Sequence, residues 1–70
     1  MSEADRLIYL IYGLLFSEES RLESDVYHSF EILKRNPKDS YYIAKYLATV
    51  QRFEDFKIFQ RKVSDLLNRF

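Results

Sequence analysis

Turn-forming residues are almost absent from this chain, since its 70 residues contain one glycine, Gly13, and one proline, Pro37. Hairpin turns between β-strands depend on glycine, asparagine and proline at special backbone positions, so a chain with so few of them has little with which to connect strands. Helices need no such residues between their ends. The sequence therefore predicts an all-α fold, in one domain over residues 1–70, because domains rarely run much shorter.

Capping signals and apolar spacing divide the first half of the chain into two helices. Ser2 followed by Asp5 is a capping-box pattern that opens the first helix, which we expect to run to Phe16. The polar stretch 17–20 is expected to be a connector, and Ser20 repeats the capping pattern for the second helix. Apolar residues of the second helix recur at helical spacing and form one stripe: Leu22, Val26, Phe30 and Leu33.

Asn36-Pro37 marks the next boundary. The residue before a proline is pushed out of the α region, so the second helix is expected to end there. The same pair can start another helix, with Asn36 as its N-cap, Pro37 at the first helical position and Asp39 in the first turn. The sequence predicts a tight helix-to-helix corner at residues 35–37.

The segment after Pro37 holds no further glycine or proline, and two interpretations of it stay open. Its apolar residues change side on a helical wheel, because Ile43, Leu47 and Val50 point opposite to those of the second half. A break near Arg52–Asp55 with a fourth helix is the favoured interpretation, and one long helix showing opposite faces to different neighbours is the other. The apolar residues of the second half alternate three and four apart, as in a heptad seam: Phe56, Phe59, Val63, Leu66 and Phe70.

The predicted architecture is a small bundle of three or four short helices that is completed by oligomerisation. The first helix is apolar nearly all round between Leu7 and Phe16, so one neighbour cannot cover it. Large exposed apolar patches are rare on soluble monomers, and closed two-fold symmetry is the commonest assembly. A homo-oligomer, most simply a dimer, is therefore the expected partner arrangement. The candidate interface residues are Leu7, Tyr9, Leu10, Ile11, Tyr12, Leu14, Leu15, Phe56, Phe59, Val63, Leu66 and Phe70.

The charges cancel over the whole chain, eleven basic against eleven acidic, but not along it. Residues 1–33 hold two basic and seven acidic side chains, a net −5, and residues 34–70 hold nine basic and four acidic ones, a net +5. The favoured interpretation is that opposite charge helps two helical hairpins to dock, or that the charged side chains simply form solvated faces. The alternative is a small nucleic-acid-binding regulator with a basic surface made of Arg52, Lys57, Arg61, Lys62 and Arg69.

No arrangement of residues in the sequence predicts catalysis, a cofactor or a metal. Cysteine is absent, and His28 is the only histidine. Asp25 and His28 share a helical face, but a di-metal bundle needs such a motif twice, with further carboxylates. Gly13 lies inside an apolar helix and forms no phosphate-binding loop. The predicted function is a non-enzymatic protein–protein interaction or self-association module.

The apolar run from Leu7 to Phe16 is also too short to cross a bilayer, which takes about 20 residues. The acidic residues before it are unlike the positively charged start of a secretion signal. We therefore expect no membrane span and a cytoplasmic location.

The stretch from Leu33 through Asn36-Pro37 to Ala44-Lys45-Tyr46 and Phe53 resembles the hairpin of type III secretion needle and inner-rod subunits. In those subunits an Asn-Pro turn precedes a helix with similar apolar spacing. The chain departs from them in its apolar first helix and its shorter last helix. The resemblance implies a second alternative function, as a needle-like, rod-like or chaperone-like component of a secretion apparatus.

Overall fold

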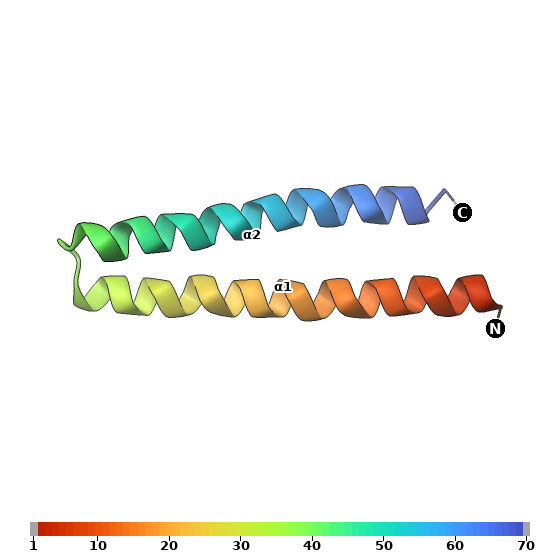
Figure 1. Ribbon diagram of the computed structural model, residues 1–70, viewed down its shortest axis with the longest axis horizontal. Helices are drawn as coiled ribbons and strands as arrows, with labels where there is room; N and C mark the ends of the chain where they lie inside the picture. Colours follow the sequence, from red (N-terminus) through yellow and green to blue (C-terminus); the bar gives the residue numbers. More distant parts are fainter. Residues whose placement is uncertain (1, 70) are drawn as a thin grey trace.

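The protein is an antiparallel pair of long helices joined by one short loop (Figure 1). This computed structural model describes residues 2–69, in which α1 spans Glu3–Arg35 and α2 spans Ser40–Leu67. The start of α1 and the end of α2 lie together at what we call the open end, opposite the loop at the closed end (Figure 1). The predicted all-α class is confirmed.

Residues 2–69 form two long helices rather than the predicted three or four short ones. α1 continues through residues 17–20, where a connector was expected. Serine and glutamate cost a helix little compared with glycine or proline, and this stretch contains neither. Glu18 also pairs with Arg21 one turn later, which supports the helix across the stretch. A polar run without a helix breaker is therefore helix interior here.

α2 likewise passes without interruption through Arg52–Asp55, so the favoured prediction of a break there is wrong. The structure follows the other interpretation, one long helix that shows apolar residues on different sides. Half-buried side chains recur four and three residues apart on the side toward α1: Tyr42, Tyr46, Thr49, Phe53, Phe56, Gln60, Val63 and Leu67. That alternation is a heptad pattern, so the two helices pack as a short antiparallel coiled coil.

α1 contributes a matching heptad to the contact between the helices. Leu15, Leu22 and Ser29 follow one another at seven-residue intervals and are 8%, 4% and 5% exposed. They are the buried residues among those described, and Glu19 and Val26 between them are half-buried. The core is this small because each helix of a hairpin has a single neighbour.

The predicted N-cap of α1, Ser2, is confirmed, whereas the reciprocal bond of a capping box, from the Ser2 backbone N–H to the Asp5 carboxylate, is not observed. The Ser2 hydroxyl oxygen accepts a hydrogen bond from the Asp5 backbone N–H at 3.2 Å. The same hydroxyl donates to the Asp5 carboxylate at 2.9 Å. The first bond satisfies a backbone N–H group that would otherwise lack a partner at the helix start, and the second links the two side chains.

The predicted tight corner is confirmed in place but not in its capping. α1 ends at Arg35, and Asn36 is its C-cap, with its backbone N–H donating to an α1 carbonyl. Asp39, not Asn36, is the N-cap of α2, because its carboxylate accepts the backbone N–H of Tyr41 at 2.9 Å. Pro37 therefore lies in the loop and not at the first position of the helix.

Candidate interaction surface

A polar layer around Glu19 crosses the contact between the helices. Glu19 occupies a seam position of α1 where a heptad ordinarily places an apolar residue. Its carboxylate accepts hydrogen bonds from Lys57 Nζ at 2.8 Å and from Gln60 Nε2 at 2.7 Å. The bond from Lys57, followed by that from Gln60, holds the pKa of Glu19 below its ordinary value of 4.5. Because both donors belong to α2, this layer selects one alignment of the two helices.

A second polar layer lies nearer the closed end. The Ser29 and Thr49 hydroxyl oxygens are 2.8 Å apart. Each hydroxyl also lies within hydrogen-bond distance of a carbonyl oxygen three residues earlier, at 3.0 Å to Val26 and 2.8 Å to Tyr46. The two hydroxyl groups have only two protons for these three contacts. The hydrogen bond between the helices therefore forms when one hydroxyl donates to the other hydroxyl instead of to the carbonyl of its own helix. Small side chains on both helices let the two hydroxyls meet directly.

Glu19 predicts a pH dependence of stability. Since the folded-state pKa of Glu19 is lowered, its contribution to the free energy of unfolding is present above about pH 4.5 and is lost as the pH falls through the lowered value. We expect the difference in Tm between the wild type and Glu19→Gln to be largest near neutral pH and to shrink in acid. Thermal melts followed by circular dichroism test this. A difference that grows in acid would contradict it.

Neither polar layer was predicted from the sequence. Glu19 was expected in a connector, and Ser29 was not expected in the core. A usable signal was present, because Leu15, Leu22 and Ser29 repeat every seven residues, and Glu19 and Val26 repeat in parallel with them. Polar residues interrupt both series, so a search for apolar stripes alone does not find them.

The coiled coil leaves two long faces beside the contact between the helices, because antiparallel pairing brings corresponding flanks of α1 and α2 together. The first, which we call the Leu14 face, comprises Leu7, Ile11, Leu14, Glu18, Arg21 and Asp25 of α1 with Lys45, Arg52, Asp55, Phe59, Lys62 and Leu66 of α2. The opposite one, the Phe16 face, comprises Tyr9, Phe16, Glu23, Tyr27 and Phe30 of α1 with Ile43, Leu47, Val50, Glu54, Lys57 and Arg61 of α2.

The Leu14 face is mainly apolar toward the open end, where Lys62 is the charged side chain between Phe59 and Leu66. Its large hydrophobic side chains there are all exposed in the single hairpin, and Leu14 is the most exposed of them at 72%. Phe59 and Leu66 had been predicted to share one stripe with Phe56 and Val63, but they flank the contact with α1 and are 55% and 54% exposed. This half of the face therefore presents hydrophobic side chains of both helices to solvent.

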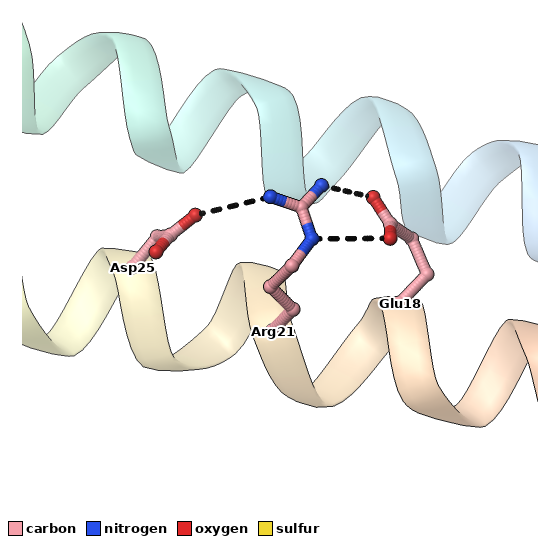
Figure 2. A network of polar contacts seen from close by, with 3 residues as sticks. All are labelled: Glu18, Arg21 and Asp25. Carbon is pink, nitrogen blue, oxygen red and sulfur yellow. Dashed lines mark hydrogen bonds and ion pairs between the residues drawn. The ribbon is translucent and has the colours of Figure 1, made fainter.

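The other half of the Leu14 face is charged. Figure 2 shows the Arg21 guanidinium between the carboxylates of Glu18 and Asp25, all on α1. Arg21 Nε donates to Glu18 at 3.2 Å, and a terminal nitrogen lies 3.9 Å from Asp25. The hydrogen bond with Arg21 lowers the pKa of Glu18 and raises that of Arg21. All three groups are open to solvent, so they remain accessible to charges outside the hairpin.

The Phe16 face is also partly apolar. Phe16 is 71% exposed. It borders a shallow groove of about 580 Å³ whose lining includes Tyr12, Leu15 and Gln60. Toward the closed end Phe30 packs on Tyr46 of α2, with ring centroids 5.6 Å apart. Both faces therefore expose hydrophobic side chains, and the two faces differ in the arrangement of their charged residues.

The structure divides the candidate interface residues between different surroundings. Three pack between the two helices of the same chain: Leu15, Phe56 and Val63. Five lie together on the Leu14 face: Leu7, Ile11, Leu14, Phe59 and Leu66. Tyr9 and Tyr12 lie toward the Phe16 face, Leu10 lies on the outer side of α1, and Phe70 is outside the described residues.

The candidate basic residues do not form one surface. Lys57 bonds to Glu19 between the helices. Arg61 lies on the Phe16 face, whereas Arg52 and Lys62 lie on the opposite side of the hairpin. Arg69 follows α2 at the open end. A phosphate backbone lying along either face would meet only part of the set.

Within residues 2–69, neither helix has the combined length and apolar content that crossing a bilayer requires. The same residues hold no group of three histidine, aspartate or glutamate side chains placed to bind a metal ion. Comparison of the chain with protein-family models, with curated proteins and with solved structures finds no match.

Proposed function

We propose that the chain is a non-enzymatic self-association module whose working form is a homodimer of hairpins. Surface area carries the proposal. The hairpin exposes 5864 Å², whereas a compact protein of 8.5 kDa exposes about 4,650 Å². The excess of about 1,200 Å² exceeds the roughly 800 Å² that each partner covers in a standard protein interface.

The shape of the hairpin supports the same proposal. Its radius of gyration is 16.2 Å, against about 11 Å for a compact domain of this length. Domains are built from at least two packed layers of secondary structure, and this hairpin, 11 Å across its thinnest direction, is a single layer. A second hairpin supplies the second layer.

The exposed side chains supply the driving force. Fifteen large hydrophobic residues are exposed in the described part of the chain, against two hydrophobic residues buried in its core. Fully burying one such side chain contributes about 1.5–3 kcal/mol. Five from each copy would offset the loss of translational and rotational freedom on association, estimated at about 4–15 kcal/mol.

Sedimentation equilibrium over a range of concentrations tests this function. We expect a mass of twice 8.5 kDa and a Tm that rises with protein concentration. A mass of 8.5 kDa at high micromolar concentration, with a cooperative melt independent of concentration, would contradict it. Binding to DNA or RNA that weakens steeply with salt, by an unassociated chain, would support the nucleic-acid alternative instead.

A further inference from the structure

We propose that two copies associate through the Leu14 face, with both loops at the same end of a four-helix bundle and α1 of each copy packed on α2 of the other. This inference rests on the proposed self-association and names the surface and the geometry that it uses. Its basis is the match between the two halves of the Leu14 face when that face meets a copy of itself.

The contacts within the hairpin establish which residues of α1 and α2 lie at the same height, by which we mean the same position along the length of the hairpin. Ser29 meets Thr49, and Glu19 bonds to both Lys57 and Gln60. Counting from these contacts at 1.5 Å per residue gives the height of every other position. A two-fold axis parallel to the bundle leaves all heights unchanged, so each α1 residue meets α2 residues of the second copy at its own height.

The apolar halves then coincide. Ile11 is level with Leu66 of the second copy, and Leu14 lies between the levels of Phe59 and Leu66. Overlapping the full hairpins with their loops at opposite ends would instead place Leu14 level with Asp25 and Ile11 level with His28. Of these two full overlaps, only the one with both loops at the same end brings Ile11 and Leu14 to the level of hydrophobic side chains of the second copy. The same counting places the charged Glu18 and Lys62 at the levels of Phe59 and Leu14 of the other copy.

The charged halves are complementary in the same arrangement. Arg21 is level with Asp55 of the second copy, and Asp25 is level with Arg52 of the second copy. Two-fold symmetry makes each of these pairs twice. Within residues 2–69 Arg52 forms no ion pair, and Asp55 accepts one side-chain hydrogen bond, from Gln51 at 2.9 Å. Both groups therefore keep capacity for a partner outside the hairpin.

The Phe16 face lacks this complementarity. The same two-fold operation on that face puts Glu23 level with Glu54 of the second copy, twice. Like charges facing one another oppose association. Lys57, the basic residue nearest in height, is already bound to Glu19. Charge therefore selects the Leu14 face for a second copy of this chain.

A matched pair of substitutions tests the choice of face. Leu14 and Phe16 are 72% and 71% exposed in the hairpin and differ by two positions. We expect Leu14→Glu to raise the dimer Kd at least tenfold and Phe16→Glu to change it less than about twofold. The reverse result would overturn the Leu14 face while leaving self-association intact. A wild-type chain that sediments as a monomer would overturn both proposals.

A charge exchange tests the pairing even where a single variant loses stability. Asp25→Arg and Arg52→Asp each place like charges together in their own homodimers, so both should associate more weakly than the wild type. An equimolar mixture restores opposite charges at both sites, and we expect the affinity to recover. Damage to the fold of either variant gives no such recovery. Absence of recovery on mixing would overturn the pairing.

Spin labels test the direction of the hairpins. The chain contains no cysteine, so Lys38→Cys provides one label site in the loop. With loops at the same end and neighbouring helix axes about 10 Å apart, the two labels lie much closer than the 54 Å length of the hairpin. A distance equal to or above that length would overturn the proposed geometry.

Discussion

Ser20→Pro is expected to unfold most of the hairpin. Ser20 lies in the middle of α1, where proline removes a backbone hydrogen bond and its ring clashes with the preceding turn. The cost is about 3 kcal/mol or more. A 70-residue chain has a small total stability, so this loss is a large part of it. Circular dichroism and urea unfolding measure the effect.

Ser40→Pro is the matched control. Ser40 is the first residue of α2, where the backbone N–H has no partner within the helix and proline is favoured. The preceding residue, Asp39, has φ −86° and ψ 114°, an extended conformation that a following proline accepts. We expect wild-type helicity from this variant. If Ser20→Pro were equally well tolerated, the stretch 17–20 would be a connector and α1 would not be continuous.

Leu22→Ala is expected to lower the free energy of unfolding by about 2–5 kcal/mol. Leu22 is the most buried residue of the described chain at 4% exposure, and it packs in the middle of the contact between the helices. The substitution removes its burial and leaves a cavity, which neighbouring seam residues fill only in part. Chemical denaturation at fixed protein concentration measures the change.

Leu47→Ala is the control for that substitution. Leu47 is 59% exposed on the Phe16 face, outside both the seam and the proposed dimer surface. We expect a change within about 0.5 kcal/mol, as for ordinary surface positions. Equal losses from Leu22→Ala and Leu47→Ala would show that the helices pack through a different face.

Two interleaved heptads explain why the orientation of α2 could not be predicted. The predicted stripe contained Phe56, Phe59, Val63 and Leu66, and the observed seam contains Phe56, Gln60 and Val63. Both series alternate three and four, and they share Phe56 and Val63. The predicted series is the more hydrophobic, because Gln60 occupies a position of the observed one. Apolar periodicity alone therefore favours the face that the hairpin leaves exposed.

The candidate interface set was partly predictable for the same reason. Exposed residues such as Leu7 and Leu14 belong to the apolar run that identified them. Phe56 and Val63 were included because hydrophobicity does not distinguish burial against the same chain from burial against another. The complementary charges of Arg21 and Asp55 become visible only after the two helices are aligned.

The sequence by itself determined the helical class, the Ser2 cap and the corner after Arg35. These features depend on interactions within a few residues, such as capping hydrogen bonds and the steric effect of Pro37. Only the tertiary structure decided that there are two helices and which side of each faces the other. That choice depends on Glu19 reaching Lys57 and Gln60, 38 and 41 positions away. A contact between such distant residues depends on the alignment of the whole helices, which no local pattern specifies.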